Sequence, residues 1–220
     1  MKIVEPGYEI LSEISEDGMK ELKAIERAAR TCYKSEGRTH ADGKSAVALI
    51  KALLSRKHEA MLEHGGMTVK FICDRGVSHE LVRHRMASFA QESTRYCNYG
   101  KDSFGREITV IKPLFEDGSE MYRLWYSTML VCENTYLEMI EDGVAPQMAR
   151  SVLPNSLKTE VVVTANWREW RHIFTLRCAP DAHPDIRRIM VPLCRGMQQR
   201  IPLIFDDCLA SEVDAGDEDA

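Results

Sequence analysis

The segment from residue 83 to residue 96, RHRMASFAQESTRY, holds the densest set of side chains that could do chemistry. It carries three arginines and a histidine, interleaved with hydroxyl and amide side chains. Arginine presents fixed, forked donors that match a phosphate or a planar heterocycle. Serine, glutamine and backbone N–H groups can complete such a cradle. The segment therefore indicates a binding site for an anionic or planar ligand. The alternative, a charged helix face followed by a polar loop, is more frequent on composition alone.

Other reactive side chains lack the partners that catalysis or metal binding would need. Ser93 has no GxSxG turn around it, so a binding role is favoured over a nucleophilic one. His58 and His64 are six residues apart and do not share a helix face as the ligands of an HExxH metal site do. The seven cysteines are scattered without a CxxC pair, which argues against a zinc site or a disulfide framework. We expect no metal.

Charge and hydropathy limit the possible partners. The net charge is −5, but residues 206–220 hold seven acids and no base, so the rest of the chain carries −5 + 7 = +2. No stripe of Lys and Arg indicates a broad nucleic-acid surface. No apolar run reaches the roughly 18–20 residues that span a bilayer, and the N-terminus has no signal-peptide pattern. We expect a cytoplasmic protein that binds neither membrane nor nucleic acid.

Hydrophobic periodicity predicts helices and strands without regular alternation. A helix is predicted from Met19, and a second around residues 47–54. Alternation predicts strands at residues 2–11, 67–73, 107–112 and 157–166. Further helices are predicted at 77–86, 119–140, 167–177 and 185–200, and Pro192 is expected to kink or split the last. On the long helix the expected apolar side comprises Met121, Trp125, Thr128, Cys132 and Met139.

This pattern predicts an α+β protein rather than a doubly wound sheet. We expect a single domain over residues 1–208, with a mainly antiparallel sheet flanked by long helices. Residues 209–220 are expected to form an acidic, disordered tail. No GxGxxG or Walker A sequence is present, so a nucleotide or flavin would not be held by a Rossmann-type turn.

The arginine-rich segment resembles the signature of the flavin-dependent thymidylate synthases. RHR, seven further residues and Ser93 reproduce its spacing, and STRY continues the match. The resemblance extends to HEAMLEH at 58–64, ARSVLPNSL around Arg150 and NWREWRHIFTLR at 166–177. It spans about residues 58–178.

The resemblance implies an enzyme that converts dUMP to dTMP by reductive methylation. The expected cofactor is FAD, with 5,10-methylenetetrahydrofolate as carbon donor and NADPH as reductant. Homotetramers with active sites at subunit interfaces are also implied. The flavin would carry the hydride, and the protein would orient it over the base.

The resemblance also implies roles for individual residues, one of them at the reacting ring. Arg177 would lie against the uracil ring as the catalytic residue, where a guanidinium can stabilise developing negative charge. Arg150 would reach dUMP from another subunit. Gln91 and His172 stand where relatives can have an acid and an asparagine. The implied flavin-site residues are His64, Arg83, His84, Arg85, Gln91, Asn166 and His172. The implied dUMP-site residues are Glu80, Arg83, Gln91, Glu92, Ser93, Thr94, Arg95, Arg150 and Arg177.

Two rival hypotheses remain at the level of sequence. A non-enzymatic nucleotide- or RNA-binding module built on the Arg83–Arg95 cluster predicts a colourless protein whose affinity falls steeply with salt. The unrelated cysteine-dependent thymidylate synthases predict one essential cysteine that is trapped covalently by a fluorinated dUMP.

Overall fold

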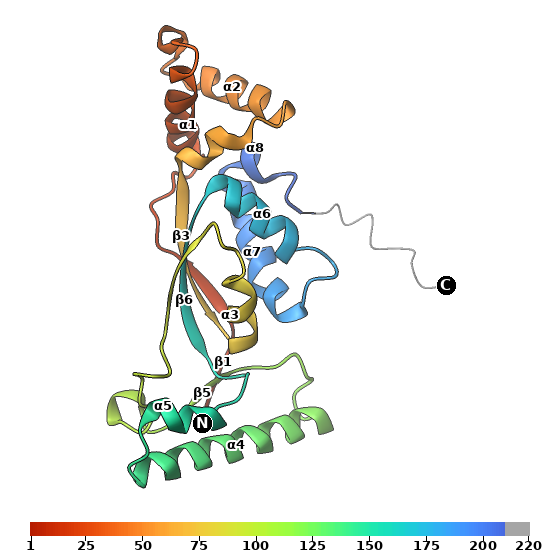
Figure 1. Ribbon diagram of the computed structural model, residues 1–220. Coiled ribbons are helices and arrows are strands. Elements are labelled where there is room, and N and C mark those ends of the chain that lie inside the picture. The colour runs from red at the N-terminus through yellow and green to blue at the C-terminus, as the bar shows by residue number, and fades with distance from the viewer. Residues whose placement is uncertain (210–220) are drawn as a thin grey trace. The chain divides into compact units, whose positions relative to one another are not determined.

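The computed structural model describes residues 1–209 (Figure 1). The chain divides into two compact units. The first comprises Met1–Gly7, Lys70–Arg83 and Phe89–Val162. The second comprises Tyr8–Val69, His84–Ser88 and the chain from Val163 onward. The architecture is mixed α and β with an antiparallel sheet, as the sequence predicts. The prediction of one family domain over 1–208 stays a prediction, and residues 210–220 of the predicted tail lie outside the described residues.

The antiparallel sheet has the strand order β2-β3-β6-β4. Its strands are β2 (Gly7–Ile10), β3 (Gly66–Cys73), β6 (Thr159–Asn166) and β4 (Ser88–Gln91). β3 buries Met67, Val69, Phe71 and Cys73, the alternate residues that the period-two pattern selects. The division between the two units falls within β3 and within β6, so both strands contribute residues to each unit.

The first unit has its own core under a long helix. Strands β1 (Lys2–Val4) and β5 (Thr109–Ile111) pair in parallel, with Ile3 opposite Val110. Ile108 and Leu157 join this core, where Tyr136 of the long helix is fully buried. The helical elements of the unit are α3 (Arg75–Leu81), η3 (Asp102–Phe104), α4 (Glu120–Glu141), α5 (Pro146–Ala149) and η4 (Arg150–Val152).

The second unit is mainly helical. Its elements are α1 (Met19–Thr31), η1 (Glu36–Arg38), α2 (Lys44–Ser55), η2 (Glu59–His64), α6 (Trp167–Arg177), α7 (Pro184–Arg200) and α8 (Pro202–Phe205). α6 packs beside α7 (Figure 1). The buried Trp170 indole donates from Nε1 to the Met67 carbonyl oxygen at 3.0 Å, which fixes α6 against the start of β3.

Several predicted elements differ from the structure. The predicted strand at 2–11 is two strands, β1 and β2. The helix predicted at 77–86 ends at Leu81, so Arg83 and Arg85 lie in the turn that follows rather than on a helix face. The strand β4 was not predicted. Pro192 does not split α7, whose neighbouring residues Leu193 and Cys194 are fully buried, so burial of this face outweighs the missing N–H.

The apolar side predicted for the long helix is wrong in part: Trp125 and Met139 pack against the core, but Thr128 is exposed. The buried residues of α4 are Met129, Glu133 and Tyr136, whereas Met121 is half exposed. Glu133 is buried because it pairs with the N-terminal ammonium group at 2.9 Å and accepts from the Ile108 N–H at 3.0 Å. A periodicity count of apolar residues cannot detect a buried carboxylate of this kind.

Within residues 1–209, the helices are too short or too polar for any of them to cross a membrane. Over the same residues, no three His, Cys, Asp or Glu side chains gather into a group that could hold a metal ion.

Candidate functional site

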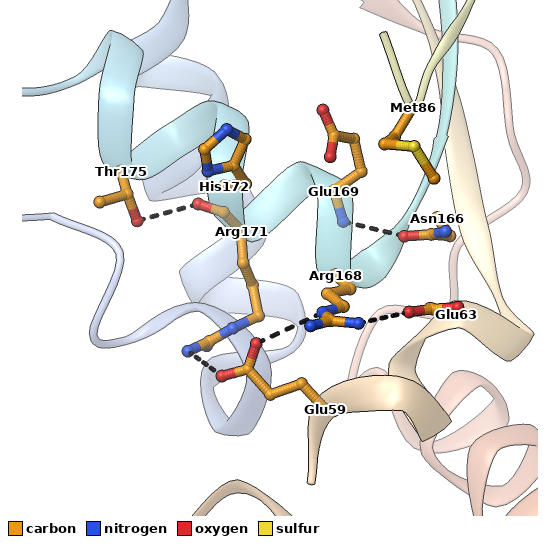
Figure 2. Close-up of a pocket in the computed structure, with 9 residues that line it drawn as sticks. All are labelled: Glu59, Glu63, Met86, Asn166, Arg168, Glu169, Arg171, His172 and Thr175. Carbon is orange, nitrogen blue, oxygen red and sulfur yellow. Dashed lines mark hydrogen bonds and ion pairs between the residues drawn. The ribbon is translucent and has the colours of Figure 1, made fainter. Parts of the chain in front are cut away.

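A cavity of about 510 Å³ opens beside α6 in the second unit (Figure 2). Two residues of the predicted flavin site, Asn166 and His172, line it. The remaining lining residues lie in the segments that resemble the family, although no individual role is predicted for them; they are Glu59, Glu63, Met86, Arg168, Glu169, Arg171 and Thr175.

Helical geometry brings these side chains to one wall. Arg171 and His172 come three and four residues after Arg168, and Thr175 comes four and three residues after them, so these side chains share a face of α6. The start of the helix is fixed because Asn166 caps it, its Oδ1 accepting from the Glu169 N–H at 2.8 Å.

The approach of the chain to that cap requires a glycine. A Cβ on Gly66 would lie 2.2 Å from the Ala165 carbonyl oxygen, which is too close for any other residue. Gly66 therefore allows β3 to begin directly against the end of β6, where α6 starts.

The two arginines of this wall differ in how they are held. Arg171 donates to both carboxylate oxygens of Asp207, at 2.6 and 2.8 Å, and to the Ile204 carbonyl oxygen. Arg168 donates to Glu63 at 2.6 Å, in a pair whose side chains are both about half exposed. Glu59 lies 3.9 Å from Arg168 and 3.7 Å from Arg171. Arg171 is therefore a structural tie, whereas Arg168 is held by more exposed ion pairs.

Asp207 belongs to the acidic stretch that begins at residue 206, within the domain predicted over 1–208. Its carboxylate anchors Arg171, so this stretch contributes at least one structural contact.

A buried histidine connects the arginine-rich motif to the end of α6. His84 is 5% exposed, and its Nε2 accepts a hydrogen bond from Arg177 Nε at 3.0 Å. Its Nδ1 lies 3.6 Å from Glu169 Oε1. The His172 ring meets the His84 ring edge-on, with 5.7 Å between centroids. Residues 84, 169, 172 and 177 thus form one cluster.

The charge states of the cluster follow from this geometry. A guanidinium has only donors, so the His84 nitrogen facing it must be an unprotonated acceptor. Burial, with the nearby Arg177 and His172, lowers the pKa of His84 to about 4. Burial raises the pKa of Glu169 above its usual value. His84 is therefore neutral at physiological pH, and its contact with Glu169 is not an ion pair.

A second cavity, of about 580 Å³, lies in the first unit. Arg150 Nη1 lies 3.5 Å from Thr94 Oγ1, and Arg95 Nε donates to Gln147 Oε1 at 3.3 Å. Arg95 also stacks on the Tyr96 ring, 5.3 Å from its centroid. The cavity is lined by Arg75, His79, Thr94, Gln147, Met148, Arg150, Ser151, Leu153, Pro154, Asn155 and Leu157.

Gln91 and Glu92 anchor the segment that leads into this cavity. Gln91 Nε2 donates to Ser78 Oγ at 2.9 Å. Glu92 accepts from the Tyr99 hydroxyl at 2.9 Å and from Lys158 Nζ at 3.0 Å. These side chains are engaged within the first unit, while Arg95 and the adjacent Arg150 are exposed.

Comparisons with known proteins identify the family. A family model described as "Thymidylate synthase complementing protein" matches residues 16–203. A flavin-dependent thymidylate synthase of Geobacter sulfurreducens is 35% identical over 189 residues, which cover 84% of this chain and 80% of that protein. The chain belongs to the flavin-dependent thymidylate synthase family. Another member, from Corynebacterium aurimucosum, is 31% identical over 210 residues, covering 89% of this chain and 83% of that one.

The fold is shared with a solved structure. A UMP/dUMP methylase, PolB of Streptomyces cacaoi, bound with 5-Br dUMP, superposes with a TM-score of 0.75 at 24% identity. The match covers 94% of this chain and 96% of that chain.

The residues that the family signature singles out fall into two groups. Those in the second unit are His64, His84, Arg85, Asn166, His172 and Arg177, and those in the first are Glu80, Arg83, Gln91, Glu92, Ser93, Thr94, Arg95 and Arg150. Among the residues of the second unit, His64 and Arg85 are exposed and do not line the α6 cavity. Arg168 could have been found from its spacing to His172. Glu59 and Glu63 lie in the HEAMLEH segment at 58–64, which the resemblance covers without assigning either carboxylate a role.

Proposed function

We propose that this chain converts dUMP to dTMP by reductive methylation, with FAD as cofactor, 5,10-methylenetetrahydrofolate as carbon donor and NADPH as reductant. Membership of the flavin-dependent thymidylate synthase family supports the reaction. The observation that carries the residue assignment is the 3.0 Å contact between Arg177 Nε and His84 Nε2, because it ties the RHR motif to the proposed catalytic guanidinium.

Arg177 is assigned to the uracil ring. Methylation at carbon 5 requires electron density on that carbon, and negative charge then develops on the ring oxygens and nitrogen. A guanidinium stabilises this charge without losing its own proton. Because Arg177 is already held by a buried group, little reorganisation is needed when the charge forms.

The wall of the α6 cavity suits a dinucleotide that carries phosphates. Asn166, Arg168 and His172 would hold FAD there, and Arg168 is the cation that can leave its exposed carboxylate partner for a phosphate. His64, His84 and Arg85 complete the proposed flavin set, with Arg83 and Gln91. When bound, the flavin supplies the hydride chemistry.

The cavity of the first unit suits a nucleoside monophosphate. Ser93, Thr94, Arg95 and Arg150 would bind the phosphate and sugar of dUMP. Thr94 and Arg150 line the cavity, and the exposed Arg95 contacts Gln147, which also lines it. Glu80 and Arg83 are proposed as further dUMP contacts. For Gln91 and Glu92, we propose that their anchored side chains hold the binding segment in place.

Cysteine chemistry is not favoured by the environment of three of the seven thiols. Burial raises the pKa of Cys73 and of Cys208 to about 12, far from the range of a catalytic thiolate. Burial also raises the pKa of Cys97. These thiols are therefore poor nucleophiles at neutral pH.

A homotetramer is the proposed assembly, and a cytoplasmic location is proposed with it. One face of α4 supports association, because Met121, Leu124 and Val131 are 50%, 61% and 64% exposed. A row of exposed apolar residues on a long helix is typical of an interface with another chain. We propose that another copy of this chain covers it, and that active sites combine groups from different subunits.

The decisive experiment is the spectrum and turnover of the purified protein. We expect a yellow protein whose flavin band bleaches with NADPH, and formation of dTMP from dUMP that requires methylenetetrahydrofolate. A colourless protein that binds RNA with a steep salt dependence would instead support the binding-module hypothesis. Covalent trapping at a cysteine by a fluorinated dUMP would support the cysteine-dependent class.

Mixed oligomers test whether sites are shared. Assayed at dUMP well below saturation, Arg150→Ala chains (through weak binding) and Arg177→Ala chains (through slow chemistry) should each be weakly active alone. Co-refolded together, they should recover part of the activity if a site takes these two arginines from different subunits. No recovery would indicate that one subunit supplies both. Co-refolding Arg150→Ala with Ser93→Ala chains is the matched comparison for the recovered activity, since both of these residues belong to the first unit.

A further inference from the structure

His84 is poorly placed to be only a ligand contact. The motif RHR puts it between two exposed arginines, yet His84 itself is 5% exposed. Its polar atoms face other protein groups: Nε2 accepts from Arg177 Nε at 3.0 Å, and Nδ1 faces Glu169 Oε1 at 3.6 Å. A group enclosed in this way acts through its neighbours.

The direction of the hydrogen bond fixes the tautomer. Arg177 can only donate, so the proton of the neutral imidazole must be on Nδ1, facing the Glu169 carboxyl group. The separation of 3.6 Å is too long for a normal hydrogen bond, so this contact orients the imidazole electrostatically rather than binding it tightly. The His172 ring, packed edge-on at 5.7 Å, limits rotation of the His84 ring.

We propose that His84 is a positioning residue that aims the Arg177 guanidinium at the pyrimidine, with Glu169 holding the imidazole in the tautomer that this requires. This inference rests on the proposed function. Arg177 is the last residue of α6, and Cys178 caps the helix. The contact of Arg177 Nε with His84 fixes the plane of the guanidinium relative to the helix. A planar ligand would be met through the forked Nη1 and Nη2 atoms, whose direction follows from that plane.

Two amide substitutions of His84 test its two ring nitrogens separately. In His84→Gln, the side-chain oxygen can take the place of Nε2 and accept from Arg177. In His84→Asn, the shorter amide reaches the place of Nδ1 and leaves Arg177 Nε without its acceptor. Both variants are polar and smaller than histidine, so a general loss of packing affects both.

The measurements are made on the full-length, flavin-loaded protein. We expect His84→Asn to lower the kcat for dTMP formation roughly ten- to hundredfold, as for a lost hydrogen bond to a charged group, with a smaller change in the KM for dUMP. The kcat of His84→Gln should stay at least tenfold higher than that of His84→Asn. Equal losses in the two amides, or a larger loss in the glutamine variant, would overturn the proposal.

A double-mutant cycle separates positioning from a structural role. In an Arg177→Ala background, His84→Asn should cause little further loss, because the group it positions is gone. If the fold-losses of kcat in the two single variants multiply in the double variant, the proposal is contradicted.

A measurement without turnover separates this inference from the proposed function. The Arg177 Nε–H proton should exchange slowly with solvent in the wild type and in His84→Gln, and fast in His84→Asn, by NMR. Fast exchange in the wild type would refute the positioning role even if dTMP forms. Slow exchange without dTMP formation would leave the contact intact and refute the function that it is proposed to serve.

Discussion

The α6 cavity of the second unit and the cavity of the first unit both depend on arginines, but they hold them differently. Around α6, Arg171 is tied to Asp207 by two contacts, and Arg177 is tied to a buried histidine. In the first unit, Arg95 and Arg150 are exposed and contact neutral groups at 3.3 and 3.5 Å. A guanidinium fixed in advance suits charge that develops during a reaction. An exposed one on a neutral partner can turn toward an arriving anion.

The largest effect is expected when a fixed arginine beside α6 is removed. Arg177→Ala should lower dTMP formation by about 10²–10³-fold, because a preorganised donor to developing charge is lost. The flavin absorption spectrum should be unchanged. Arg106→Ala, which removes an exposed pair with Glu141, is the control for loss of a positive charge. Turnover within tenfold of the wild type would remove Arg177 from its assigned role.

A pH measurement sharpens the contrast through stability. The pKa of His84 is about 4 in the folded chain and near 6.5 when unfolded. As pH falls, the unfolded chain therefore takes up the proton first. The lowered pKa of His84 therefore contributes roughly 3 kcal/mol to the pH dependence of the free energy of unfolding. This contribution is complete above pH 6.5 and is lost between pH 6.5 and 4. Denaturant unfolding should show this loss in the wild type and a flatter profile in His84→Gln. Parallel profiles would mean that His84 is not buried in its neutral form.

The exposed region should respond in binding rather than in chemistry. Arg150→Ala or Arg95→Ala should weaken dUMP binding by about 1.5–3 kcal/mol, the value of a hydrogen bond to a charged group. The kcat at saturating dUMP should change only a few-fold. Calorimetric titration with dUMP measures the effect, with Arg123→Ala on the exposed part of α4 as the control. Should kcat fall as far as affinity, the contrast between the two regions would be lost.

The smallest effect concerns the tie between α6 and the chain after α8. Arg171 lowers the pKa of Asp207, so this pair stabilises the fold above the usual carboxyl pKa and is lost as pH falls through the lowered value. Because Asp207 is largely exposed, Asp207→Asn should cost at most about 1 kcal/mol at pH 7. Thermal unfolding should show a small decrease in Tm at pH 7 that disappears in strong acid. An equal decrease at both pH values would indicate a cause other than the ion pair.

Much of the fold could be predicted from the sequence because burial there follows a simple period. β3 alternates buried and exposed residues, and α6 covers the predicted range 167–177. The failures have physical causes. The helix at α3 ends early although its sequence favours continuation, and α4 turns a carboxylate inward because the N-terminal ammonium group lies nearby. In α4, a contact between residues far apart in sequence decided the outcome.

The sequence by itself determined the family, the arginine-rich motif and most helices and strands, since these depend on local spacing and on an uncommon string of residues. Only the tertiary structure decided which arginines are held and which are exposed, and that His84 is buried against Arg177, 93 positions away. The reason is that burial and charge state depend on neighbours that the fold supplies, and adjacent residues in RHR can therefore have opposite environments.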